Sequence, residues 1–213
     1  MINLSKCDPW IFDTEKTSPI IDVDSVEKCL ERDSYKKGKH FFRKTDDKRI
    51  YCICPVYVNG LIINYKKIFK LAKKFNLKII NDCAGSFLTI KNFKDLSKYS
   101  DISISSFNGN KCPSSGMGGC TITKSKKYGK FINNYIQNFT TKKKYLHSFF
   151  GFNCRITNIH ASILFCELKN VKNLEKKKNQ IYNFYLKELN KKIQFYFFEK
   201  KNNREVIWIN QLI

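Results

Sequence analysis

The sequence predicts an α/β fold built on a parallel β-sheet, and three observations support this prediction. A strand, a helix and a second strand follow one another within about thirty residues, at 50–56, 64–75 and 77–82. Two further short runs, at 101–106 and 119–123, are also suited to strands. A long helical pattern fills much of the C-terminal third. The strand–helix–strand unit implies two parallel strands that are joined by a right-handed crossover.

The first fifty residues are the least regular part of the chain. Residues 19–23 favour a short strand, and Ser25 is expected to cap a helix that reaches Glu31. The stretch 32–49 is strongly charged. We therefore expect an exposed excursion or a hairpin between this first helix and the more regular region that follows.

The two strands and one helix face of the predicted βαβ unit are apolar, as in a sheet that is buried beneath a helix. Its first strand is bounded at Pro55 and carries Cys52 and Cys54 at alternate positions, as buried thiols often do. Its second strand ends at Asp82. Its helix has lysines on one face and apolar residues at helical spacing on the other; these are Ile68, Phe69, Leu71, Ala72 and Phe75.

Beyond this unit the pattern is a Gly-rich loop and then a long helix. The segment 108–119, between the last two predicted sheet strands, holds four glycines and one proline. Thr157 is a plausible N-cap for a helix that continues toward Leu189, with a break near Asn179. Two final strands are predicted at 193–198 and 206–209.

Length and composition exclude several classes of protein. At 213 residues the chain suits one large domain, or one domain and a fragment. With 42% hydrophobic residues it can bury a core, which excludes wholesale disorder. No window approaches the ~18 consecutive apolar residues of a membrane span, and the first residues do not resemble a signal peptide. We therefore expect a cytoplasmic protein with no membrane partner.

The cysteines point to neither a disulfide scaffold nor a metal site. There are nine of them, an odd number, and no Cys-x-x-Cys motif occurs. The three histidines do not lie beside them at metal-ligand spacing. We therefore predict no bound metal and expect reduced thiols in the core.

The net charge of +22 raises the question of a nucleic-acid partner. Only five of the 40 basic residues are arginine, and arginine is the side chain that forks onto phosphate and guanine. Abundant Lys, Asn, Ile, Phe and Tyr are what an AT-rich coding sequence produces. The lysine runs are interpreted as solvated faces, so we expect no nucleic-acid partner, and a basic nucleic-acid-binding protein is the least favoured alternative.

Two ionisable residues lie where an open α/β sheet binds ligands, beyond the carboxyl ends of its strands. Asp82 ends one strand, and small residues follow it; Lys111 lies in the Gly-rich loop after another. A desolvated lysine can act as an amine nucleophile, and an aspartate can pair with a protonated ring nitrogen, as in a pyridoxal phosphate site. On spacing alone, an ordinary cap and a solvated lysine remain alternatives. The glycines favour a tight turn over a phosphate cradle.

Several motifs in order resemble one family. The chain is similar to DegT/DnrJ-type nucleotide-sugar aminotransferases, within the fold type I pyridoxal phosphate enzymes, over about residues 7–190. The motifs that carry the resemblance lie at 55–60, 72–84, 106–111, 116–119 and 151–161. Segments 8–13 and 21–24 also resemble a branch that acts on 4-keto sugars for surface polysaccharides.

The resemblance implies a role for five residues. Lys111 would hold pyridoxal 5'-phosphate as a Schiff base and serve as the general base. Asp82 would keep the pyridinium nitrogen protonated, and Ser106 would bind the cofactor phosphate. Asn153 and Arg155 match a segment that reaches the neighbouring subunit's active site, which implies a homodimer. For these two, a hydrogen-bond network at a helix start is the alternative.

The resemblance also implies a fold and a division of the chain. The expected fold is a fragment of the fold type I large domain, a mixed, mostly parallel sheet flanked by helices. Residues 1–150 would be a partial cofactor-binding domain without its N-terminal part, and 151–213 a long helix with the truncated start of the small domain. The missing N-terminal part would have supplied a phosphate-binding turn and a ring-stacking aromatic residue. Gly85 replaces a position that is often polar in the family.

The expected activity is transfer of an amino group, from a donor such as glutamate, to a keto group of a nucleotide-linked sugar. The alternative is a catalytically inactive fragment, or a subunit that needs a separately encoded N-terminal half. Loss of the phosphate cradle would remove charge-assisted hydrogen bonds of ~1.5–3 kcal/mol each.

Overall fold

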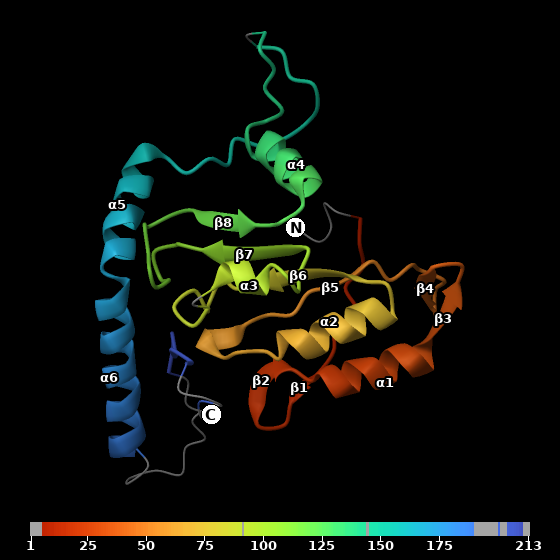
Figure 1. The fold of residues 1–213 in the computed structure, drawn as a ribbon, viewed down its shortest axis with the longest axis horizontal. Coiled ribbons are helices and arrows are strands. Elements are labelled where there is room, and N and C mark those ends of the chain that lie inside the picture. Colours follow the sequence, from red (N-terminus) through yellow and green to blue (C-terminus); the bar gives the residue numbers. More distant parts are fainter. Residues whose placement is uncertain (1–5, 91, 144, 190–199, 201–203, 211–213) are drawn as a thin grey trace.

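The computed structural model describes residues 6–90, 92–143, 145–189, 200 and 204–210. At its centre lies a four-stranded sheet in the order β5-β6-β7-β8 (Figure 1). The β5–β6 and β6–β7 pairs are parallel, and β7–β8 is antiparallel. This confirms the predicted mixed, mostly parallel sheet. The strands span Cys52–Ile53, Lys78–Asp82, Ile102–Ser106 and Gly119–Ile122.

A short hairpin and a helix precede the sheet. Strands β1 and β2 span Thr14–Glu15 and Ser18–Ile21, and helix α1 spans Val23–Asp33. The predicted cap was wrong: Asp22 caps α1, because its carboxylate accepts hydrogen bonds from the backbone N–H groups of Asp24 (3.0 Å) and Ser25 (3.1 Å). The helix therefore begins before Ser25.

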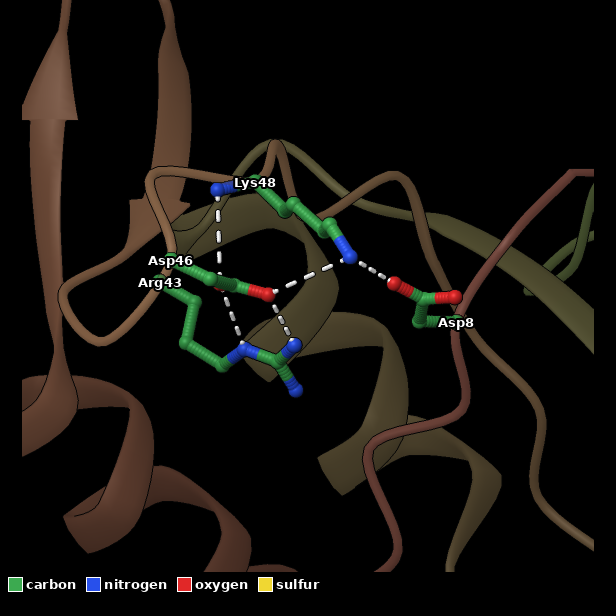
Figure 2. Close-up of polar contacts among 4 residues, drawn as sticks. All are labelled: Asp8, Arg43, Asp46 and Lys48. Carbon is green, nitrogen blue, oxygen red and sulfur yellow. Dashed lines mark hydrogen bonds and ion pairs between the residues drawn. The ribbon is translucent and has the colours of Figure 1, made fainter.

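The charged stretch after α1 was expected to be an exposed excursion or a hairpin, and it forms a hairpin. Strands β3 and β4 span Ser34–Lys37 and His40–Arg43 and pair antiparallel. A small cluster of charges ties this hairpin to the N-terminal segment (Figure 2).

In this cluster Arg43 Nε donates to Asp46 at 2.9 Å, which lowers the pKa of that carboxyl to about 2. Lys48 Nζ bridges Asp46, at 3.6 Å, and Asp8 (Figure 2). Because the groups are exposed to solvent, the cluster fixes position more than it adds stability.

Helix α2, Tyr65–Lys74, crosses between the parallel strands β5 and β6 as predicted. Asn64 caps it by accepting a hydrogen bond from Lys67 N at 3.1 Å. Its apolar face is buried and packs beside α1 (Figure 1). The resulting core joins α1, α2, β6 and the 3-10 turn Val58–Gly60.

The C-terminal helical part differs from the prediction. The helix expected from Thr157 toward Leu189 is divided into α5 (Asn158–Lys169) and α6 (Val171–Leu189). The break lies at Asn170 and not, as was predicted, near Asn179. Asn170 ends α5, since its N–H bonds back to Cys166 and Glu167 carbonyls. Thr157 caps α5 as predicted. Two helices were not predicted, α3 (Phe93–Leu96) and α4 (Lys126–Ile136).

Residues 204–210, called here the C-terminal strap, lie against the middle of the fold. The strand predicted at 206–209 is absent, because the strap binds through side chains and isolated backbone contacts instead. Buried Glu205 accepts a hydrogen bond from Ile62 N at 2.8 Å, and Val206 N donates to Thr89 Oγ1 at 2.9 Å. The strand predicted at 193–198 lies outside the described residues.

The thiols are less buried than expected. Cys83 is fully buried, but Cys52 is half-buried and Cys54 is exposed. The alternation of side chains along the strand explains this, since Ile53 points into the core and the two cysteines point to the opposite face. Within the described ranges, no cluster of three or more metal-ligating side chains occurs and no helix could span a membrane.

Candidate functional site

The candidate site lies at the carboxyl ends of β6 and β7. Asp82 is the last residue of β6, next to Ile104 of β7. Its backbone is held by the segment that follows β5: Asp82 N donates to Pro55 O at 3.0 Å, and its carbonyl accepts from Tyr57 N at 2.8 Å. Its Oδ1 accepts a hydrogen bond from Ala84 N at 2.9 Å. The carboxylate is therefore fixed in orientation at the sheet edge.

Ser106 ends the adjacent strand β7 and starts the loop that carries Lys111. Ser106 Oγ accepts from Asn108 N at 3.3 Å, and Asn108 O accepts from Lys111 N at 2.8 Å. Farther along, Ser115 N donates to Phe107 O at 2.9 Å. The loop connects two antiparallel strands, as the tight-turn interpretation of its glycines predicts. Ser106 and Lys111 are thus joined by a compact, hydrogen-bonded turn.

Lys111 lies against an aromatic ring that sequence reasoning missed. Its Nζ is 3.8 Å from the ring centroid of Trp208, on the C-terminal strap. The indole is held at two further points, because Nε1 donates to Asn110 O and the backbone N–H donates to Asn59 O, both at 2.9 Å. No local sequence pattern predicts the contact between Trp208 and Lys111, since Trp208 is distant in sequence from the loop that it contacts.

The missing side chain of Gly85 leaves room for the indole of Trp208. A Cβ atom at Gly85 would lie 3.1 Å from a ring carbon of Trp208. The indole therefore fills the space between Gly85, three residues after Asp82, and the amine of Lys111. One aromatic side chain links the two halves of the candidate site.

The structure does not bring Asn153 and Arg155 into this group. Both are exposed, on the segment that leads to α5, and Asn153 pairs with Gln137 through a β-bridge. In the part of the chain that the structure describes, no hydrogen bond or ion pair joins either side chain to Asp82, Ser106 or Lys111. Their role stays a prediction.

The donor set fits pyridoxal phosphate in its chemistry. An amine, a carboxylate and a hydroxyl come from the ends of two adjacent parallel strands and the loop that follows. Small residues follow Asp82, and Gly85 leaves a space large enough for an aromatic ring, since an indole fills it. The same observation places Trp208 beside the amine that a flat ligand would have to reach.

Comparison with known proteins identifies the family. All of residues 1–213 match the model of the DegT/DnrJ/EryC1/StrS aminotransferase family. This chain belongs to that family. The fold agrees with this: a DegT DnrJ EryC1 StrS aminotransferase from Brucella abortus superimposes with a TM-score of 0.79 at 19% identity, covering 99% of this chain and 54% of that one.

Curated relatives of this DegT-family chain are sugar-modifying enzymes by name. GDP-perosamine synthase of Escherichia coli O157:H7 is 31% identical over 167 residues, which cover 78% of this chain and 45% of the relative. GDP-perosamine synthase of Vibrio cholerae is 26% identical, over 80% of this chain and 49% of its own length. The chain thus spans about half the length of the curated relatives that it matches.

A solved relative carries a form of the expected cofactor. The ntda structure from Bacillus subtilis holds bound cofactor PMP and superimposes with a TM-score of 0.70 at 23% identity, over 94% of this chain and 42% of that one. By the family model and the curated relatives, the DegT-family chain resembles pyridoxal phosphate-dependent sugar aminotransferases.

Proposed function

We propose that this chain is the lysine-bearing part of a pyridoxal phosphate-dependent aminotransferase. The enzyme would transfer an amino group to a keto group of a nucleotide-linked sugar, for polysaccharide or cell-surface glycan biosynthesis. The observation that carries the proposal is the position of Lys111, in a compact turn directly after β7, beside a sheet edge that also presents Asp82.

Each residue of the site has a task in this proposal. The bound cofactor supplies an electron sink for the carbon that gains or loses the amino group. Lys111 would hold the cofactor covalently and, when its amine is free, move a proton at the reacting carbon. Asp82 would accept a hydrogen bond from the protonated ring nitrogen, and Ser106 would donate one to the phosphate. The hydrogen bond from Ala84 N to Asp82 Oδ1, which restrains the carboxylate, supports this role.

The substrates follow from the names of relatives. GDP-perosamine synthases are among them, and so is a 3-oxo-glucose-6-phosphate:glutamate aminotransferase of Bacillus subtilis, 28% identical over 67% of this chain. We infer a nucleotide-linked keto sugar as acceptor and glutamate as donor. The division at residue 150, into a partial cofactor-binding domain and the start of a small domain, belongs to the same proposal.

We also infer a homodimer, in which Asn153 and Arg155 would reach the partner's site. Large apolar side chains near them are exposed, including Phe149 and Phe150, and such surfaces are typical of protein interfaces. Phe149→Ser with Phe150→Ser should shift the chain from dimer to monomer in light scattering. Ile11→Ser, at an exposed apolar residue on the N-terminal segment, should not.

The alternative is an inactive fragment, or a subunit completed by a separately encoded N-terminal half. The observation that favours it is the coverage of 45% and 49% of the two GDP-perosamine synthases. In that case, cofactor binding by this chain alone should be weak and should strengthen when the missing half is added.

Covalent capture of the cofactor tests the proposed role of Lys111. Purified chain is mixed with pyridoxal phosphate, the absorbance spectrum is recorded, and the complex is reduced with borohydride and mapped by mass spectrometry. We expect the label on Lys111, and its loss in Lys111→Ala. Lys177→Ala, at an exposed lysine on α6, is the matched control and should keep the label. Labelling spread evenly over surface lysines would contradict the proposal.

A further inference from the structure

Two cysteines of the sheet edge lie together on the segment that borders Asp82 of the candidate site. Cys52 is in β5 and Cys54 follows two positions later, so both side chains point to the same face of an extended segment. Their sulfur atoms are 3.8 Å apart, within hydrogen-bond distance for thiols. Cys54 is exposed and Cys52 half-buried, so reagents in solution reach the pair.

The contact makes the two thiols unlike. Either thiol can be the donor in this contact; with Cys54 donating, the hydrogen bond stabilises a thiolate at Cys52 and lowers the pKa of Cys52. The same bond raises the pKa of Cys54. Cys52 is therefore more often thiolate at neutral pH than an ordinary cysteine, and the thiolate is the nucleophilic form of cysteine.

We propose that Cys52 and Cys54 are a reversible dithiol–disulfide site, oxidised by a low-molecular-weight disulfide such as glutathione disulfide. Cys52 is the attacking sulfur and Cys54 is the resolving one.

The exchange balances in two steps. The Cys52 thiolate attacks one sulfur of glutathione disulfide, which forms a mixed disulfide and releases one glutathione thiolate. That thiolate takes up the proton that Cys54 loses, and the Cys54 sulfur then attacks Cys52 and expels the second glutathione. Two protein thiols are oxidised and one glutathione disulfide is reduced to two glutathiones.

The backbone geometry suits a strained bond that opens readily. Alternate residues of an extended strand have Cα atoms about 6.6–6.8 Å apart, at the upper end of the range of roughly 4.4–6.8 Å seen in disulfides. Closing the sulfur–sulfur distance from 3.8 Å to a bond therefore requires the strand to bend locally between the two cysteines. A disulfide at the limit of this range is easily reduced, as regulatory disulfides are.

Other cysteines of the chain differ in the properties that matter. Burial raises the pKa of Cys83 and of Cys120, so these thiols stay protonated at neutral pH. Cys154 is exposed on the segment before α5, far along the chain from the pair. It serves as an internal control, because an exposed thiol without a resolving neighbour keeps its glutathione.

The sequence around the pair makes the test direct. Trypsin cleaves after Arg49 and Lys66, and the peptide 50–66 contains Cys52, Cys54 and no other cysteine. Folded protein is incubated with glutathione disulfide at pH 7, and the reaction is quenched with acid. The protein is then alkylated and digested, and the mass of each peptide is measured by mass spectrometry. We expect the 50–66 peptide to be two hydrogen atoms lighter and free of alkyl groups and glutathione. The Cys154 peptide in the same sample should carry glutathione.

Single variants separate the two roles. Cys54→Ser should leave glutathione on Cys52. Cys54→Ala should slow the first exchange roughly tenfold at pH 7, because it removes the hydrogen-bond donor and the pKa of Cys52 returns toward its ordinary value near 8.5. Cys52→Ser should react slowly at Cys54. Circular dichroism checks that each variant is folded.

Two results would overturn the proposal. One is a wild-type 50–66 peptide that keeps glutathione, or carries an alkyl group on both thiols, under conditions that modify Cys154. The other is a first exchange that is equally fast in wild type and in Cys54→Ala. Dithiothreitol should restore two alkylatable thiols, and failure to do so would exclude a reversible site. None of these measurements depends on the proposed aminotransferase activity.

Discussion

The βαβ region and the helical region of this chain differ in where their apolar side chains go. Helix α2 buries Ile68, Leu71 and Ala72 in the core. Helices α4 and α5 bury no residue, and α6 buries only Tyr182. One region is built around its own core, and the other presents apolar side chains to the surroundings.

Helix α5 shows what this difference means. Apolar residues occur nearly all round it, and Ile159 is 74% exposed. A helix of that composition is normally buried against other elements. In Figure 1, α5 and α6 run along one side of the sheet, and α4 stands away from it with the following loop. We therefore expect these helices to be covered by further protein in the assembled state.

The largest expected effect comes from the same substitution made in each region. Ile68→Ala on α2 should lower the free energy of unfolding by about 2–5 kcal/mol, because it leaves a cavity in the core. Ile159→Ala on α5 should change it by less than about 0.5 kcal/mol, as surface substitutions do. Urea denaturation measures both. Equal losses would show that α5 is already buried in solution.

The second effect concerns the contact that joins the strap to the βαβ region. A Cβ atom at Gly60 would lie 2.0 Å from Val206 O, and Gly60 has a φ of +95°. Gly60→Ala should therefore cost about 2–4 kcal/mol and release the strap. Gly38→Ala, in an open hairpin turn with a φ of +61°, should cost only about 1–2 kcal/mol. Denaturation of the two variants checks this difference.

The third effect is a loss of folding stability at high pH, which we expect to arise from two buried groups of the βαβ region. Burial raises the pKa of Tyr57 and of Cys83 above their ordinary values of 10.0 and 9.0. Both groups are neutral when folded, so their contribution is complete below those values and is lost as pH rises above them. Each group should cost up to about 1.4 kcal/mol per pH unit there.

The measurement is a set of urea titrations from pH 8 to pH 11. Tyr57→Phe and Cys83→Ala should each flatten the decline. A decline that neither substitution alters would locate its cause elsewhere in the chain.

The smallest effect concerns the strap and the candidate site. Trp208→Ala removes the ring that lies 3.8 Å from Lys111 Nζ, a contact worth about 0.5–1 kcal/mol. Lys111 should then react two- to fivefold faster with pyridoxal phosphate, measured by stopped-flow absorbance. Trp10→Phe, at the other tryptophan, is the control and should leave the rate unchanged. Slower capture in Trp208→Ala would mean that the indole supports the bound cofactor.

The sequence allowed prediction of those elements whose boundaries and buried faces depend on local residue patterns. Amphipathic spacing identified α2 and its buried face, and alternating apolar runs identified β6 and β7. The break between α5 and α6 was misplaced because Asn170 and Asn179 are equally plausible helix ends in a lysine-rich stretch. Helix α4 was missed because Gly129 and two asparagines interrupt its apolar pattern.

The candidate site divides in the same way. Asp82, Ser106 and Lys111 follow from strand ends and motif order, both of which are local. Trp208 does not, because its contacts with Asn59, Gly85 and Lys111 join distant parts of the chain. The half-exposed state of Cys52 was also missed, since only the fold shows that Ile53, and not Cys52, points into the core.

The contact between Glu205 and Ile62 has a consequence for biosynthesis. The hydrogen bond spans 143 positions, and contacts of such sequence separation form late because a long loop must close first. The βαβ region emerges from the ribosome well before the strap does. During that interval neither Gly60 nor the amine of Lys111 is covered by the strap. Cofactor present during translation would therefore meet Lys111 before Trp208 arrives.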